Sequence, residues 1–405
     1  MGRKSSEIVL FLQVLLLVVP AQAQQLLDGE FGGIDLGRQL IEPARFPTLT
    51  ELREAVRRPE IYAVLMMKLF GDGNNHYLPI WSGDGQRLAF QRSDVRMKSS
   101  KLLLFNSLSQ AKPTLLSEEP GTYDYMFRWG VNSESGFVFA RIDSRAGATH
   151  VWFSPDGTNL QNQTPGPGRH QYPALYQRTD GIWRLVYDRD GQLVHEAWNE
   201  QGAVESAAAL AGSGSRGTSP RWSRDGFRMV LARMREQTRP GQVAAYDMVV
   251  RNLRTEKDIA LPAALSGAVR SPSWSPDEQM VAFYAKEQGD NKPWRIQVCA
   301  VVENGSSQLL GDEVVVNPDF ESEGPAWEPG GRRVWFFSHS RRKQAYYPLV
   351  AADVKTGAIS VIDYPNRCTT PYDVAINPIT EVPEIAFMAH DGLPQDLFVV
   401  FMNHY

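Results

Sequence analysis

Cysteine, long hydrophobic runs and motifs of known catalytic sites are all scarce in this sequence. Only two cysteines occur, Cys299 and Cys368. They could pair in an oxidising compartment, but two cysteines do not make a disulfide framework in a chain of 405 residues. The sequence contains no CxxC motif, no Cys/His cluster with zinc spacing and no G-x-S-x-G motif. These absences argue against a disulfide-stapled domain, a zinc finger and a serine hydrolase.

Charge of one sign is not concentrated anywhere along the chain. Charged residues make up 22% of the sequence, and the formal net charge is −4. Because there is no basic block, the sequence argues against nucleic acid as a partner. The hydrophobic content of 42% can supply a sizeable core, and 10 Trp, 26 Pro and 33 Gly indicate many short strands joined by turns.

The amino terminus has the pattern of a cleavable leader. A basic pair at residues 3–4 precedes an apolar stretch at residues 8–19, and Ala21-Gln22-Ala23 follows as a small-x-small site. The alternative is a membrane anchor, but the stretch is about 12 residues long, whereas roughly 20 are needed to span a bilayer. We predict a signal peptide at residues 1–23 and a periplasmic or secreted mature chain without a transmembrane segment.

Self-similarity is the main signal in the rest of the chain. Strong copies of one unit read Pro, any residue, Trp, Ser or Glu, a tight turn and an apolar strand. They lie at 77–90, 218–232, 270–285 and 324–338, and weaker copies lie at 122–142, 171–188 and 370–389. The repeat tryptophans are Trp81, Trp129, Trp222, Trp274 and Trp327. From one Trp position to the next, the copies recur every 46 to 53 residues, a period typical of tandem β units.

Each unit predicts a four-stranded antiparallel sheet. The Asp-Gly type of turn favours a hairpin, and the indole ring fills the space between neighbouring sheets. Two further apolar segments follow each hairpin, as in KLLLF at 101–105. This pattern predicts an all-β fold, a β-propeller of seven blades, or six if the third or last copy is not independent. FSPDG at 153–157 resembles the repeat turn but falls between the third and fourth strands, so we predict an ordinary hairpin there.

The residues before the first repeat have two predicted parts. Residues 24–60 form a lead-in, with a capping box at 48–51 that starts a short helix. The propeller then spans 61–405. Its last copy lacks a fourth strand, and the apolar segment at 61–70 is predicted to supply it and close the ring. The alternative for 61–70 is a helix packed on one face, because Ala, Leu and Met favour helices.

The WSxDGxxLAF-type units resemble the WD40-like repeats of the TolB propeller family. The resemblance covers roughly residues 74–405, strongly in four units and weakly in three. The family includes periplasmic TolB, propellers attached to serine peptidases, and secreted polysaccharide lyases. TolB also has a separate amino-terminal α/β domain, and the residues before the first unit are too few for one. The resemblance therefore implies a relative by repeat and not a TolB orthologue.

Two sets of polar residues are candidates for a site. His76, Asp124 and His170 start three successive units, so they could converge near the channel and bind a divalent metal or act as acid and base. The alternative is that they are polar residues lining a wet channel mouth, since the other units have Gly217, Val269 and Ser322 at this position. Arg128 and Arg221 each precede a repeat Trp, and could point into the channel as a carboxylate site.

The sequence favours a non-catalytic function without a cofactor. Loops projecting from a rigid ring suit a scaffold that binds a protein, a peptide or a glycan on one propeller face. The alternative is a secreted carbohydrate-active enzyme, resembling a polysaccharide lyase, that would use the His76, Asp124 and His170 set with a metal.

Overall fold

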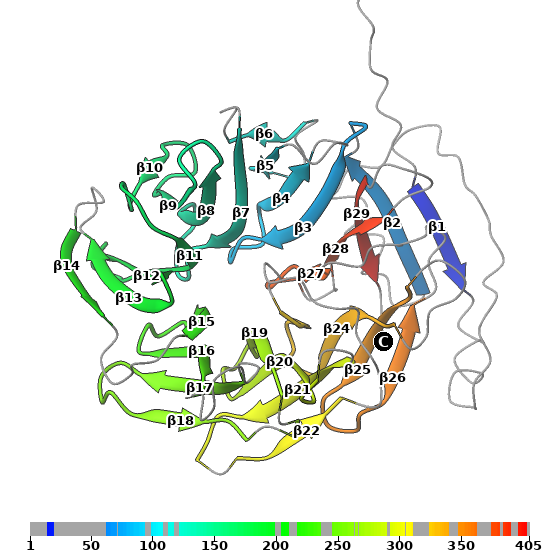
Figure 1. Cartoon of the computed structure of the whole chain (residues 1–405). Helices are drawn as coiled ribbons and strands as arrows, with labels where there is room; N and C mark the ends of the chain where they lie inside the picture. Colours follow the sequence, from blue (N-terminus) through cyan, green and yellow to red (C-terminus); the bar gives the residue numbers. More distant parts are fainter. Residues whose placement is uncertain are drawn as a thin grey trace, which may run out of the picture.

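The computed structural model of the chain consists of β-strands and the turns that join them (Figure 1). The structure describes residues 14–19, 62–70, 72–93, 99–107, 112–116, 121–198, 204–209, 217–235, 245–262, 264–265, 267–289, 292–303, 305–310, 324–339, 347–362, 374–380, 384–389 and 396–402. Within these ranges no helix has the length and apolar character that crossing a bilayer requires. The predicted helix after residue 48 and Cys368 lie outside the described residues, whereas Cys299 is buried with its thiol reduced.

The first two repeat copies form one eight-stranded sheet made of two antiparallel halves. A single parallel bridge, Ser100 to Tyr123, joins the halves. Unit 1 consists of β3 (Asn75–Trp81), β4 (Leu88–Ser93), β5 (Ser100–Phe105) and β6 (Thr114–Leu115). Unit 2 consists of β7 (Thr122–Trp129), β8 (Phe137–Asp143), β9 (Ala148–Ser154) and β10 (Gln161–Asn162). FSPDG thus joins the third and fourth strands of unit 2, and its predicted hairpin is confirmed.

The next four copies each form a separate four-stranded antiparallel sheet in chain order. Unit 3 consists of β11 (His170–Gln177), β12 (Trp183–Arg189), β13 (Gln192–Trp198) and β14 (Val204–Ala209). Unit 4 consists of β15 (Gly217–Trp222), β16 (Arg228–Met234), β17 (Tyr246–Asn252) and β18 (Asp258–Ala260). Unit 5 consists of β19 (Val269–Trp274), β20 (Met280–Lys286), β21 (Trp294–Ala300) and β22 (Ser307–Leu309). Unit 6 consists of β23 (Ala326–Trp327), β24 (Arg333–Phe337), β25 (Leu349–Asp353) and β26 (Ile359–Ile362).

The two ends of the chain share the remaining sheet, which we call the terminal sheet. Its strands are β27 (Val374–Ile376), β28 (Glu384–Ala389), β29 (Asp396–Met402), β2 (Tyr62–Phe70) and β1 (Val14–Val19). The order is β1-β2-β29-β28-β27, so β2 pairs with the last strand of the chain. The prediction of a strand at 61–70 is therefore confirmed, and the helix alternative is wrong. β1 falls within the predicted leader and pairs with the outer edge of β2.

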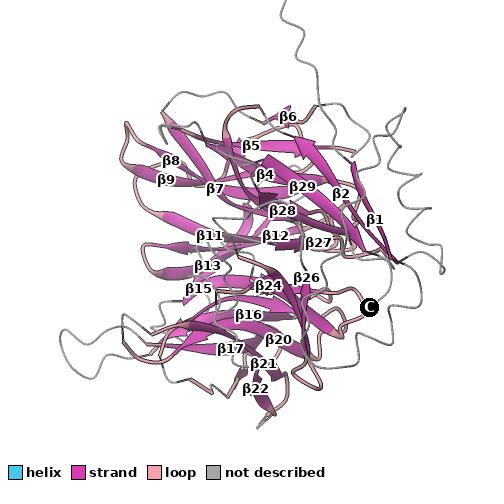
Figure 2. Ribbon diagram, turned by 90° about the vertical axis from the view of Figure 1, so that its right-hand side faces the viewer, coloured by secondary structure: helices cyan, strands magenta, loops and turns pink. Residues whose placement is uncertain are grey.

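The sheets lie side by side around a common centre, with the first strands of the units nearest to it (Figure 1). Seen from the side, turns and loops project from both faces of this arrangement (Figure 2). Aliphatic and aromatic side chains fill the space between neighbouring sheets; one such cluster joins units 5 and 6 through Ile296, Trp327 and Phe336. Each sheet therefore buries its apolar surface against the next one, which is the core arrangement of a propeller.

A β-bulge interrupts the first strand of units 1 to 5 at the same place. In unit 2, for example, the pairing of β7 with β8 shifts between Tyr125 and Arg128. The residue before the repeat Pro position adopts a left-handed backbone, with φ between 49° and 54°, at Leu78, Met126, Tyr172, Ser219 and Ser271. Gly324 holds this position in unit 6, with φ of 99°, and glycine adopts such angles without strain. The extra residue re-aims the side chains that follow it, and the Trp then enters the space between the sheets.

Four of the repeat tryptophans join their unit to the one before it. The indole Nε1 of Trp129 donates a hydrogen bond of 3.1 Å to the carbonyl of Ile80 in unit 1. Equivalent bonds of 3.0 to 3.2 Å link Trp222 to Ala174, Trp274 to Arg221, and Trp327 to Ser273. These four indoles thus lie between neighbouring units, and Trp81 is buried in unit 1.

Unit 3 lacks the repeat Trp and uses a backbone contact instead. Leu175 holds the Trp position, and the neighbouring unit reaches it through Val131. The N–H of Val131 donates to the carbonyl of Leu175 at 2.9 Å, and the N–H of Gln177 donates to the carbonyl of Val131 at 3.0 Å. Units 2 and 3 are thus joined by a parallel bridge.

Candidate functional site

Asp124 is held inside unit 2 by a buried ion pair. It lies near the start of β7, opposite Arg141 on β8. Arg141 donates from Nε to Oδ1 at 2.5 Å and from Nη2 to Oδ2 at 3.0 Å, and both side chains are almost completely buried. The guanidinium also lies over the Trp152 ring, 4.7 Å from its centroid. Two parallel N–H···O bonds to a carboxylate define a rigid pair, so Asp124 serves the packing of its own unit.

His76 and His170 have different partners in different parts of the propeller. The His76 ring is fully buried, with Nε2 3.2 Å from Oδ1 of Asp72 and its edge toward Phe90. Burial opposes ionisation of Asp72, but the hydrogen bonds with His76 and Asn74 outweigh it and hold the pKa of Asp72 well below its usual value. Nδ1 of His170 lies 3.0 Å from the carbonyl of Thr149, and burial lowers the pKa of this imidazole.

The structure therefore does not bring His76, Asp124 and His170 together. Each side chain has a local partner, and the described residues contain no group of three His, Cys, Asp or Glu side chains placed to hold a metal ion. The convergence that equivalent positions suggested is not seen: Asp124 contacts the second strand of its own sheet, His76 contacts Asp72 just before its strand, and His170 contacts Thr149 of the preceding unit.

Arg128 and Arg221, by contrast, line one cavity. Each follows the repeat Pro position directly and lies near the carboxyl end of its first strand, β7 or β15. The cavity measures about 160 Å³. Its remaining walls are three indole rings and shorter side chains from units 2 to 5: Trp129, Val131, Ala174, Leu175, Trp222, Ser273 and Trp274.

Backbone carbonyls orient both guanidinium groups. Nη1 of Arg128 donates to the carbonyl of Phe127 at 2.6 Å, and Nη1 of Arg221 donates to the carbonyl of Pro220 at 3.1 Å. Arg128 is buried, with 7% of its surface exposed, whereas Arg221 is half-buried. Both arginines have further contacts within the protein. The cavity therefore combines guanidinium groups with indole surface.

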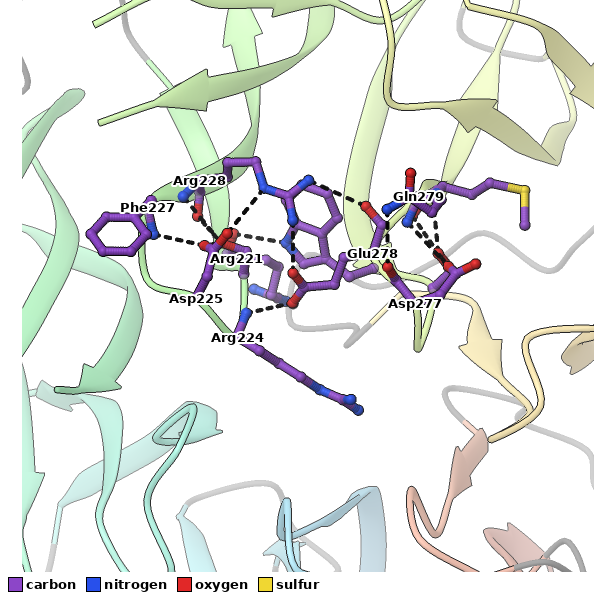
Figure 3. Close-up of polar contacts among 12 residues, drawn as sticks. Arg221, Arg224, Asp225, Phe227, Arg228, Asp277, Glu278 and Gln279 are labelled. Carbon is purple, nitrogen blue, oxygen red and sulfur yellow. Dashed lines mark hydrogen bonds and ion pairs between the residues drawn. The ribbon is translucent and has the colours of Figure 1, made fainter. Parts of the chain in front are cut away.

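A network of polar contacts fixes the turn next to Arg221, as Figure 3 shows. Nη2 of Arg228 lies 2.8 Å from Oε2 of Glu278 in the next unit, and its guanidinium lies over the Trp274 ring. The N–H of Arg224 donates to Oε1 of Glu278, while the Arg224 side chain extends away from the network and is exposed. Units 4 and 5 are thereby joined on the face that carries the cavity.

Sequence reasoning missed this network, although a signal for it exists. Glu278 stands at the turn position that is Gly85, Gly226 and Gly331 in other units, and it keeps their left-handed backbone, with φ of 56°. A non-glycine residue at a position that favours glycine indicates a side chain retained for its contacts. The outward direction of Arg224 could not be predicted from the sequence in this way.

Comparisons with known proteins find likeness in structure alone. No protein-family model matches the sequence, and no curated protein matches it. An oligogalacturonate lyase from Vibrio parahaemolyticus is 10% identical with a TM-score of 0.54, over 84% of this chain and 93% of that one. The β-propeller domain of the Trilobed protease from Pyrococcus furiosus is 11% identical with a TM-score of 0.51, over 82% and 94%.

TolB from Acinetobacter baumannii is similar over a smaller share, 61% of this chain, at 16% identity and a TM-score of 0.43. The chain spans 59% of the length of that protein. At these identities the similarity concerns the fold, which proteins of unrelated function share. With its antiparallel four-stranded units around a common centre, the chain is a β-propeller, and its repeats resemble the WD40-like repeats of the TolB type.

Proposed function

We propose that the chain is an exported, non-catalytic scaffold that binds a protein, peptide or glycan partner on one face of its propeller. That face carries the turns between the first and second strands of the units. The observation that carries the proposal is the cavity on this face, where Arg128 and Arg221 lie among three indole rings. Concave sites with apolar walls and a few oriented polar groups are the usual form of binding sites.

The proposal includes seven blades and a closed ring. Units 1 to 6 would be six blades, and β27, β28, β29 and β2 would make the seventh. Cleavage before Gln24 would remove β1 and leave four strands in the terminal sheet, as in the other blades. The pairing of β2 with β29 would then join the two ends of the chain, which removes an exposed sheet edge.

Proline substitution in β2 tests the closure. Leu65 and Met66 are successive residues in the middle of β2, opposite Phe401 and Val400 of β29. Successive N–H groups of a strand point to opposite sides, so one of Leu65→Pro and Met66→Pro removes a bond to β29 and the other affects the outer edge. We expect the substitution that removes a bond to β29 to lower the free energy of unfolding by about 3 kcal/mol. The substitution that affects the outer edge should lower it far less, because proline is tolerated at sheet edges. Urea unfolding of the mature protein measures both, and equal effects of the two substitutions would contradict closure by β2.

The competing proposal, a carbohydrate-active lyase, has no specific support in the site. It requires His76, Asp124 and His170 to act together, and they are engaged separately. The structural similarity to an oligogalacturonate lyase, at 10% identity, concerns the fold.

Position-specific crosslinking in the native cell envelope tests the scaffold function. A photoreactive residue is placed at Asp180 or Arg224, which are exposed on the cavity face, and at Arg145 on the opposite face as the matched control. We expect one partner to be captured from Asp180 and Arg224 and not from Arg145, and amino-terminal sequencing of the exported protein to start at Gln24. Capture with the same yield from both faces, or an uncleaved cytoplasmic protein, would contradict the proposal.

A further inference from the structure

We propose that the boundary between units 3 and 4 opens on acidification, because protonation of His195 places a charge between the two sheets. This property is independent of the scaffold function, since it concerns the stability of the propeller itself. Trp222 lies beside His195 at this boundary and also lines the cavity, so opening there would move one wall of the cavity.

The imidazole of His195 lies between the two sheets in an apolar environment. Its cross-strand neighbours are Val186 on β12 and Ala208 on β14, and its ring centroid is 5.8 Å from that of Trp222 on β15. Nε2 is buried and has no hydrogen-bond partner among the described residues. Such an imidazole is favoured in its neutral form, because the charged form loses hydration and gains no acceptor at Nε2.

The charges around His195 also disfavour its protonation. Among the described residues, the charge that acts on the imidazole is that of Arg184 on β12, which repels a second cation. The other charged or titratable side chains on β12, β13 and β15 have contacts of their own: Tyr187, Asp188, Arg189, Glu196 and Arg221. Glu205 stands at the register shift of β14, three residues from Ala208. Burial, together with Arg184, lowers the pKa of His195 to about 4.

The lowered pKa of His195 sets the direction of the pH effect. In the unfolded chain the imidazole binds a proton near its ordinary pKa of 6.5, whereas in the folded chain it does so near 4. Between these values the unfolded state holds more protons, so acidification shifts the equilibrium toward unfolding. The stability that depends on neutral His195 is therefore complete above about pH 6.5 and is lost as the pH falls toward about 4.

Asp188 titrates over the same pH range with the opposite effect on stability. It lies in the same sheet, opposite Leu193, and burial raises its pKa to about 6 although the N–H of Gly191 donates to it. Ionisation of this carboxyl costs stability as the pH rises, so acidification restores part of the stability that protonation of His195 removes. The unmodified protein should therefore show a small net effect, and removing either group should reveal the effect of the other.

Urea unfolding of the mature protein at about pH 7.5 and about pH 5 measures the effect of each group. On acidification, the unfolding constant of the unmodified protein should rise at least about tenfold more than that of His195→Gln, whose side chain is polar but does not titrate. Asp188→Asn should increase the rise by up to about tenfold. His339→Gln removes an exposed histidine from unit 6 and is the matched control, which should change the rise less than about twofold. Burial also lowers the pKa of His170, but this contribution is common to all of these proteins.

Hydrogen exchange of the unmodified protein locates the opening. Exchange of the amides in β13 and β15 is compared with that in β19 and β21 of the same sample, so that the chemical effect of pH on exchange cancels. We expect the ratio of the two rates to rise at least about threefold between about pH 7.5 and about pH 5, because local opening exposes the amides at the boundary. If His195→Gln does not fold, this measurement alone decides.

Two results would overturn the proposal. One is a rise in the unfolding constant of His195→Gln within about twofold of that of the unmodified protein. The other is an equal acceleration of exchange in units 3 and 5. Neither result bears on crosslinking from Asp180 and Arg224, so the scaffold function is tested separately.

Discussion

Asp124→Asn is expected to lower the free energy of unfolding by about 3–5 kcal/mol, among the largest effects of any single substitution in this chain. The substitution leaves the Arg141 guanidinium buried without its carboxylate, and an uncompensated buried charge is strongly destabilising. Urea unfolding of the mature protein followed by circular dichroism measures the change. The same substitution at the catalytic centre of an enzyme would reduce activity and largely preserve stability, so the experiment separates the two interpretations of Asp124.

A matched control and a double variant identify the cause. Asp247→Asn breaks a more exposed pair, with Arg235 at 2.6 Å, and should cost no more than about 1 kcal/mol. Asp124→Leu combined with Arg141→Met replaces both buried charges, and it should recover much of the stability that Asp124→Asn loses. If Asp124→Asn were as stable as the unmodified protein, the buried pair would not be needed for the stability of unit 2.

Trp222→Ala should cost about 3–5 kcal/mol as well, because it removes a large buried ring between units 3 and 4. The indole is 3% exposed, packs 5.5 Å from the Tyr176 ring and donates to the carbonyl of Ala174. Denaturant unfolding measures the loss. Part of the expected loss of stability comes from the cavity that the substitution leaves, because the neighbouring sheets can close it only in part.

Trp222→Phe separates the contribution of the ring to stability from that of its hydrogen bond. Phenylalanine keeps most of the apolar volume and lacks the donor, so the expected cost is about 1–2 kcal/mol. If this variant lost as much stability as Trp222→Ala, the hydrogen bond to unit 3 would matter more than the filling of space, contrary to our interpretation.

The fold was predictable because its signals are local and repeated. The Pro-x-Trp pattern, the Asp-containing turn and the following apolar strand recur with one spacing, and each copy became a hairpin. The strand at Tyr62–Phe70 could be predicted because the last copy was one strand short. In unit 3 the Trp is replaced by Leu175, and the parallel bridge that joins this unit to Val131 has no signature in the sequence.

The site was only partly predictable, because it depends on which way side chains point. Equivalent positions in the repeat grouped Arg128 with Arg221, and the two residues line one cavity. The same reasoning grouped His76 with Asp124, but these residues precede the bulge, and there the pairing places them opposite Arg92 and Arg141. A bulge reverses the alternation of a strand, so one extra residue changes which face of the sheet the following side chains occupy.

That bulge also determines where the repeats can change in length. The left-handed residue and the Trp that follows it are three positions apart in every unit that has both, whereas the spacing from one unit to the next ranges from 46 to 53 residues. An insertion or deletion of one residue between them would turn the indole away from the space between the sheets. We therefore expect changes of length to be tolerated in the loops away from this three-residue segment and not within it.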